Sequence, residues 1–188
     1  VFAGYDCFDP EPSSGLVTCA GNVPPNTPLD TSVPGEYTFT VTATDGEGNL
    51  ATAIADYSVL ANPDNDDFVD ALVLGTEGTT SGTNVGATME PSEPLHAQSL
   101  AGASVWFRWT APATGFISAD TVGSNFDTVL AIYTGTSVHE LTEVDSNDNA
   151  VGPQSALHDA PVSGGPVYSI VVAGADDDDE WGDYTLTW

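Results

Sequence analysis

The segment Tyr37-Thr38-Phe39-Thr40-Val41-Thr42-Ala43 alternates between apolar side chains and threonines. Successive side chains of an extended chain point to opposite faces, so this pattern predicts a β-strand with one apolar face and one hydroxyl face. A second strand pattern covers residues 51–60. The connection Thr44-Asp45-Gly46-Glu47-Gly48-Asn49 is rich in the residues that close tight turns, so the two strands are expected to form a hairpin.

Turn-forming residues also separate short segments in the rest of the chain. The 188 residues include 19 Gly and 13 Pro, and no stretch keeps an apolar period of 3.6 residues for three turns. No window approaches the roughly 20 continuous apolar residues of a membrane helix. The composition therefore predicts an all-β protein without membrane insertion.

A change of composition divides the chain. The stretch Ala61-Asn62-Pro63-Asp64-Asn65-Asp66-Asp67 is typical of a linker, because Pro interrupts strand pairing and consecutive Asp and Asn favour turns. We place a domain boundary there, between residues 1–61 and 62–188. The second region contains further strand patterns at 104–110, 115–121, 128–133, 141–145, 155–159, 167–173 and 183–188. We expect two β-sandwich domains.

Cys7 and Cys19 lack the C-x-x-C spacing of a zinc or redox site, so a disulfide is expected. Closing this loop contributes about 3 kcal/mol in the chain-entropy model, and such bonds persist in oxidising compartments. This predicts a secreted or cell-surface protein. The alternative is a pair of buried free thiols.

Charge is the most unusual feature of the composition. There are 28 acidic residues and a single Lys or Arg, Arg108, which gives a formal net charge of -27. Nucleic acid and anionic membranes require Lys and Arg from a binding partner, so both are excluded as partners. The acids either form a solvated coat in a saline medium or include ligands of a cation, and the two alternatives are compatible.

Two family resemblances follow from longer motifs. Residues 35–45, Gly-Glu-Tyr-Thr-Phe-Thr-Val-Thr-Ala-Thr-Asp, with Gly48-Asn49, resemble the last hairpin of bacterial immunoglobulin-like repeats. The resemblance implies an immunoglobulin-like domain over residues 1–61, whose first strand is missing. It also implies that the segment Val1-Phe2-Ala3-Gly4-Tyr5-Asp6-Cys7 is an inner strand with an unpaired edge. The missing strand is expected either in sequence upstream of residue 1 or as a strand donated by a neighbouring chain.

The second resemblance spans nearly all of residues 62–188. Asn65-Asp66-Asp67-Phe68, Ser104-Val105-Trp106-Phe107-Arg108-Trp109-Thr110, Phe126-Asp127-Thr128-Val129-Leu130 and Gly182-Asp183-Tyr184-Thr185-Leu186 are similar to motifs of the pre-peptidase C-terminal family. The resemblance implies a jelly-roll domain that serves secreted hydrolases or surface proteins as an accessory module and often binds calcium. Fold alone does not determine function.

Calcium is the expected cofactor, because closely spaced Asp and Asn in loops supply the oxygen ligands that hard cations need. The candidate ligands form two groups: Asp64, Asn65, Asp66 and Asp67 in the linker, and Asp127, Asp145, Asn147 and Asp148 near later strands. The alternative for the first group is a solvated linker, and for the second it is ordinary turn chemistry. A third acidic group, residues 176–180 with Asp183, is more typical of a hydrated hairpin tip.

Strand alternation places Trp106 and Arg108 on one face of 104–110, opposite a core face. They are candidates for a ligand-stacking surface, or for a structural cation–π pair. Catalytic motifs do not support an enzyme: His139-Glu140 begins like H-E-x-x-H, but Glu143 stands where the second His belongs, and no G-x-S-x-G is present.

The sequence thus predicts a non-catalytic extracellular accessory or adhesive binding module, stabilised by calcium, that binds an extracellular polymer or protein. The alternative is a structural subunit of a filament or surface layer, in which copies of the chain associate by strand donation.

Overall fold

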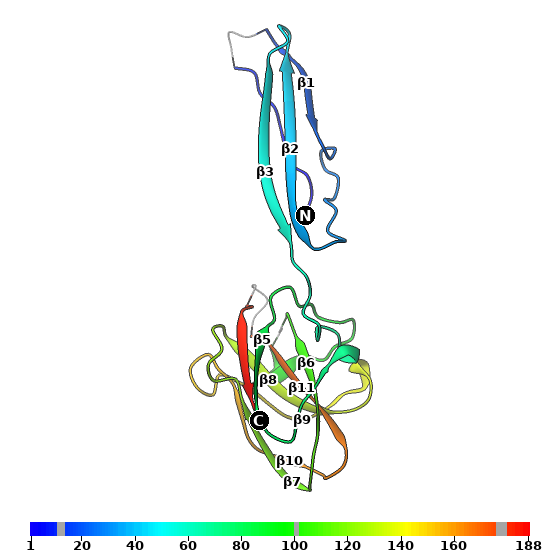
Figure 1. Ribbon diagram of the computed structural model, residues 1–188, viewed down its shortest axis with the longest axis vertical. Helices are drawn as coiled ribbons and strands as arrows, with labels where there is room; N and C mark the ends of the chain where they lie inside the picture. The colour runs from blue at the N-terminus through cyan, green and yellow to red at the C-terminus, as the bar shows by residue number, and fades with distance from the viewer. Residues whose placement is uncertain (11–13, 100–101, 176–179) are drawn as a thin grey trace. The chain divides into compact units, whose positions relative to one another are not determined.

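The computed structural model describes residues 1–10, 14–99, 102–175 and 180–188. The chain forms two compact units, Val1–Ala61 and Asn62–Trp188 (Figure 1). Within the described residues, the regular elements are β-strands and three short 3-10 helices. The expected all-β class is therefore confirmed.

The first unit contains one three-stranded sheet among its described residues, in the order β1-β2-β3. Its strands are β1 (Leu16–Gly21), β2 (Gly35–Asp45) and β3 (Leu50–Val59). The β2–β3 hairpin is the one that the Thr-rich alternation predicted, and Figure 1 shows its length. The Asp45 carboxylate closes the turn by accepting hydrogen bonds from the amides of Glu47 (2.9 Å) and Asn49 (2.8 Å).

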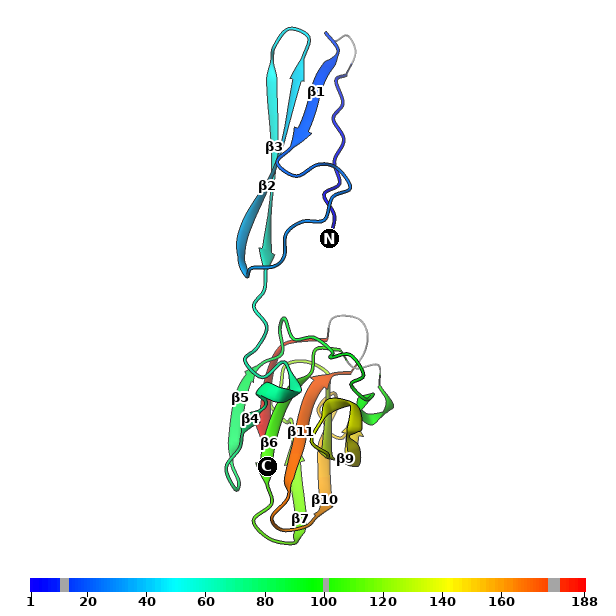
Figure 2. The same ribbon diagram turned by 90° about the vertical axis from the view of Figure 1, so that its right-hand side faces the viewer.

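The expected inner strand at Val1–Cys7 is not formed. Phe2 makes an isolated bridge with Pro28, and the backbone of Val1 and Ala3 bonds to the irregular residues 26–29. It crosses one face of the sheet (Figure 2), where the Tyr5 and Phe39 ring centroids lie 5.7 Å apart. Ala3 is the single buried hydrophobic residue in the described part of this unit.

The second unit is a β-sandwich of two sheets, in the orders β10-β7-β12-β5 and β4-β6-β11-β8-β9. Short 3-10 helices connect several strands: η1 (Phe68–Asp70), η2 (His96–Gln98) and η3 (Val138–Glu140). The strands are β4 (Leu72–Val73), β5 (Thr79–Thr83), β6 (Val105–Thr110), β7 (Gly115–Asp120), β8 (Thr128–Thr134), β9 (Thr142–Asp148), β10 (Ala156–Val162), β11 (Val167–Gly174) and β12 (Asp183–Thr187).

The core of the second unit lies between these sheets. As alternation predicted, β6 turns Val105, Phe107 and Trp109 inward, where they join Ile117 and Leu186 from the opposite sheet. A smaller cluster lies on the other face of β6 and contains Phe68, Ala71, Trp106, Ala131, Tyr133 and Val171. The segment that precedes β4 therefore covers a sheet face that was expected to meet solvent.

Candidate functional site

The second unit has a cleft at one end of its four-stranded sheet. Its volume is about 330 Å³, at the lower end of the roughly 300–1,000 Å³ of ligand pockets. Thr76 and Glu77, from the β4–β5 connection, line one side, and β7 with the turn before it lines the other. Three residues from other elements complete the lining: Trp109, Val162 and Trp188.

The cleft lies beside the part of β7 that β12 does not reach, because the antiparallel register pairs Thr187, the last residue of β12, with Asp120, the last residue of β7. Within the described residues these neighbouring strands pair at Thr187 with Asp120 alone, whereas β12 pairs with β5 from Asp183 to Thr187. Adjacent strands lie about 4.8 Å apart, so the two strands that flank β12 lie about 9.6 Å apart. The cleft continues the line of β12 at that spacing, and is therefore about one strand wide.

Aromatic rings in the cleft are held in place by the backbone. The indole nitrogen of Trp188 donates to the carbonyl of Gly75 (3.1 Å), and that of Trp109 donates to the carbonyl of Thr76 (3.0 Å). A Cβ atom on Gly78 would lie 3.3 Å from the Trp188 ring, so this ring packs directly on the glycine. Phe116 is 71% exposed. Trp109 is 4% exposed, so the aromatic surface that the cleft offers to a ligand comes from Trp188 and Phe116.

Two of the predicted linker ligands are buried and hold the linker against the sandwich. The Asn65 side-chain amide donates to the backbone carbonyl of Trp106 (3.0 Å), and the backbone carbonyl of Asn65 accepts from the backbone amide of Trp106 (2.8 Å). The Asp66 carboxylate accepts from the backbone amide of Thr88 (2.6 Å). These side chains therefore act as structural hydrogen-bonding groups.

The other two linker acids, Asp64 and Asp67, are exposed. Asp67 lies near Glu90, a carboxylate that the sequence did not single out. Burial raises the pKa of Glu90, and the charges of Asp67, Glu93 and Asp66 raise it further. The linker thus concentrates negative charge, which the sequence predicted.

The second predicted group is spread along a strand and its neighbour. Asp145, Asn147 and Asp148 belong to β9, where alternation places Asp148 on the opposite face from the other two. The Asn147 side-chain oxygen accepts from the amide of Ala156 (3.0 Å). Asp127 directly precedes β8.

No group of three or more His, Cys, Asp or Glu side chains suited to a metal ion occurs in the described parts of the chain. Residues 176–179 of the third acidic group lie outside the described residues. Both calcium sites stay predictions.

The ligand-stacking role of Trp106 and Arg108 is wrong. Trp106 is 0% exposed, because Phe68, His96 and Tyr133 pack their rings against it. Arg108 lies over the ring of Phe68, at 5.6 Å, and donates to the Phe68 carbonyl (3.1 Å). The cation–π pair exists, but its ring belongs to Phe68.

A buried hydrogen-bond chain beside Trp106 escaped the sequence analysis. His96 is 0% exposed, with Nε2 2.8 Å from the Glu93 carboxylate and Nδ1 2.8 Å from the Tyr133 hydroxyl. If Nε2 donates to the Glu93 carboxylate, Nδ1 of a neutral His96 accepts from the Tyr133 hydroxyl. Burial raises the pKa of Tyr133, which keeps its hydroxyl protonated. Each of these polar groups has a hydrogen-bond partner, so Glu93, His96 and Tyr133 form a structural hydrogen-bond network in the core.

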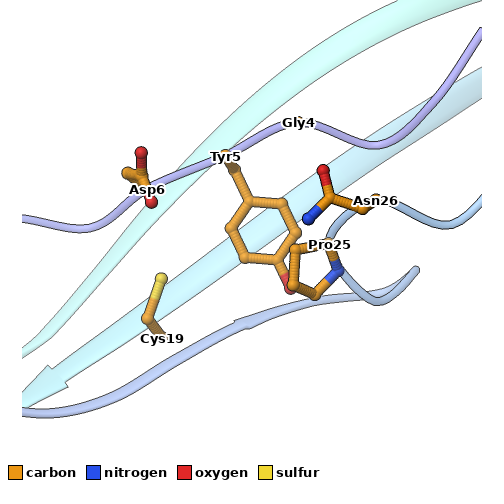
Figure 3. A pocket seen from close by; sticks show the side chains of 6 residues that line it. All are labelled: Gly4, Tyr5, Asp6, Cys19, Pro25 and Asn26. Atoms are coloured by element: carbon orange, nitrogen blue, oxygen red, sulfur yellow. The ribbon is translucent and has the colours of Figure 1, made fainter.

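The predicted disulfide between Cys7 and Cys19 is present, with an S–S distance of 2.06 Å. Near it, a hollow of about 640 Å³ opens beside Tyr5 (Figure 3). The Tyr5 hydroxyl accepts from the amide of Gly21 (2.8 Å) and is therefore engaged by the backbone. The remaining lining residues are Gly4, Asp6, Cys19, Pro25 and Asn26.

No protein-family model and no curated protein matches the sequence. A solved structure from work on "the promiscuous specificity of the carbohydrate-binding modules from the beta-sandwich super family" is similar at 16% identity, over 82% of this chain and 72% of that chain, with a TM-score of 0.23. A likeness of this size carries no statement about a ligand. No helix in the described residues is long and apolar enough to cross a membrane.

Proposed function

We propose that this chain is a non-catalytic, extracellular binding module that attaches a larger protein to an extracellular polymer or protein. The observation that carries the proposal is the cleft beside β7, whose lining includes two backbone-anchored indole rings and the exposed ring of Phe116. Buried large apolar surface at a defined place is what gives binding sites their affinity.

Other features support an extracellular setting. The disulfide persists in oxidising compartments, and a surface with 28 acids and one basic residue tolerates saline media. The proposal includes calcium as the stabilising ion, at the linker group around Asp64 and Asp67 or the group around Asp127 and Asp145.

Retention on insoluble polymers tests the module. The chain is passed over collagen, cellulose and chitin, and the fraction that each retains is compared between the wild type, Phe116→Ala and Phe8→Ala. Phe8 is 86% exposed in the other unit and serves as the matched control. Loss of one aromatic contact is expected to weaken retention roughly three- to tenfold for Phe116→Ala alone. Equal retention of both variants, or no retention of the wild type, contradicts the proposal.

A second candidate, a subunit that assembles by strand donation between copies, is favoured by β3. This strand lies at the edge of its sheet among the described residues, and Ile54 at its centre is 66% exposed. Long exposed edges pair readily with other strands. Sedimentation at increasing protein concentration separates the candidates, since a subunit associates without any foreign ligand.

A further inference from the structure

We propose that His96, Tyr133 and Glu143 form a pH-dependent hydrogen-bond switch. Protonation of His96 turns the Tyr133 hydroxyl from His96 to Glu143, which adds a hydrogen bond between β8 and the edge strand β9. None of the three residues belongs to the described lining of the cleft beside β7, so this inference does not depend on the proposed function.

The Tyr133 hydroxyl lies between two possible acceptors. Its oxygen is 2.8 Å from Nδ1 of His96 and 3.5 Å from Oε2 of Glu143. Burial raises the pKa of Tyr133, and the charge of Glu143 raises it further, so the hydroxyl keeps its one proton. A hydroxyl that donates to a carboxylate lies about 2.5–2.7 Å from it. The longer distance to Glu143 therefore indicates that the Tyr133 proton points to His96 in this structure.

Protonation of His96 reverses the direction of this bond. In the neutral ring that donates from Nε2 to Glu93 (2.8 Å), Nδ1 carries a lone pair and accepts from Tyr133. The protonated ring carries a hydrogen on both nitrogens, so Nδ1 becomes a donor and the Tyr133 oxygen must accept. The Tyr133 proton then turns to Glu143. One proton enters from water, and no covalent bond of the chain other than this N–H forms or breaks.

The surroundings of His96 supply counter-charge for a protonated ring. The Glu93 side chain is 0% exposed and lies directly on Nε2, so the buried positive charge would have a buried negative partner. Carboxylates outnumber the one cation on the elements around the ring. The titratable and charged groups there are Glu90 and Glu93 from its own loop, Tyr133 from β8, Glu143 from β9, Arg108 from β6, and Asp67 and Asp70 from η1 and its N-cap.

The position of Glu143 makes β9 the element that responds. Among the described strands β9 pairs with β8 alone, at the edge of its sheet. The register between them shifts between Ile132 and Tyr133, so β9 has one extra residue, Val144, where the ladder is interrupted. Glu143 lies opposite Tyr133 at this point, and its Oε1 accepts from the Ser146 hydroxyl (2.8 Å). A bond from Tyr133 to Oε2 would thus join the two strands where their backbone pairing is irregular.

The test follows the isotope-labelled chain by NMR from about pH 8 to pH 5, the range in which histidines usually change charge. The ring ¹⁵N shifts of His96 report its protonation, and the Cζ shift of Tyr133 reports the direction of its hydroxyl. We expect the two to change together. At the pH where His96 is protonated, we expect the β9 amides to exchange roughly two- to tenfold more slowly than in Tyr133→Phe.

The matched control is Tyr168→Phe on β11 of the same sheet. It also removes a hydroxyl that is engaged by the backbone, since the Tyr168 oxygen accepts from the amide of Ser163 (2.7 Å). This variant is expected to keep the coupling between His96 and β9. The exposed His139 and His158 are internal controls, and their protonation is expected to leave the Tyr133 Cζ shift unchanged.

Three outcomes overturn the proposal. The first is a His96 ring whose ¹⁵N shifts stay constant over the whole range. The second is a Tyr133 Cζ shift that does not follow His96, and the third is an equal change of β9 exchange in Tyr133→Phe. If Tyr133→Phe does not fold, Glu143→Ala takes its place, because Glu143 is exposed. That variant is expected to keep the titration of His96 and to lose the β9 response, and a β9 response like that of the wild type rejects the switch.

Discussion

At the scale of single residues, Glu90 is a carboxylate whose ionisation the fold opposes. Its side chain accepts from the amide of Phe68 (2.6 Å), which anchors the first residue of η1. Burial, together with the charges of Asp67, Glu93 and Asp66, raises the pKa of Glu90. The Glu90 carboxylate thus anchors η1 through this hydrogen bond, while its negative charge is unfavourable in the folded chain.

The unfavourable ionisation of Glu90 predicts that the stability of the fold depends on pH. A carboxyl whose pKa is higher in the folded chain stabilises the fold below its ordinary value of 4.5, and this stabilisation is lost as the pH rises through the raised pKa. Glu90→Gln keeps an acceptor oxygen without the charge. We expect it to melt at a higher temperature than the wild type at pH 7, and the difference to shrink below pH 4.5. Thermal unfolding across this range, without divalent ions, checks the prediction; a lower melting temperature at pH 7 contradicts it.

At β6 the sequence predicted which side chains share a face, but not which segment covers that face. Alternation correctly placed Trp106 and Arg108 on the face away from the sandwich core. It could not reveal that Phe68, almost 40 residues earlier, folds over that face, because coverage by a distant segment leaves no local periodicity. The Glu93–His96–Tyr133 chain escaped for the same reason, since Tyr133 joins it from a different strand.

At the scale of elements, β5 depends on a missing side chain. A Cβ on Gly82 would lie within 2.7 Å of the Tyr184 ring carbon that carries the hydroxyl, and Tyr184 is 3% exposed. Gly82→Ala is therefore expected to destabilise the second unit by about 1–3 kcal/mol through overpacking. The matched control is Gly115→Ala in the same sheet, where a Cβ meets nothing within 4 Å. Chemical denaturation measures both, and equal stabilities would contradict the prediction.

The composition of β5 explains why the sequence did not predict this strand. Thr79-Thr80-Ser81-Gly82-Thr83 has no apolar alternation, so it does not read as a strand. It pairs nonetheless with β12, because Tyr184 covers Gly82 and the hydroxyls of Thr79 and Thr187 lie 3.1 Å apart. The strands with apolar alternation, such as β7 and β11, were located from sequence. Predicting the cleft required the register between β7 and β12, which no single segment encodes.

At the scale of the whole molecule, the net charge of -27 makes stability sensitive to cations. With an extracellular-type dissociation constant near 10⁻⁴ M, about 1 mM calcium adds roughly 1.4 kcal/mol for one site. We expect calcium to raise the melting temperature more than magnesium does, at fixed ionic strength.

Paired variants locate this effect. Asp64→Asn with Asp67→Asn is expected to reduce the calcium response if the linker binds the ion. Glu77→Gln with Glu140→Gln removes the same charge from exposed positions of the same unit and serves as the control. Calorimetry that shows no change on adding calcium or a chelator rejects calcium as the stabilising ion.

The covalent bond between Cys7 and Cys19 also changes how the chain carries a mechanical load. A pulling force that enters at the first residues passes through the sulfur atoms and bypasses the 12 peptide units between them. At roughly 3.3–3.6 Å per extended residue, about 40 Å of contour is withheld from extension. A thiol that reduces the bond releases this slack, so the length to which the first unit can be extended differs between the oxidised and the reduced chain.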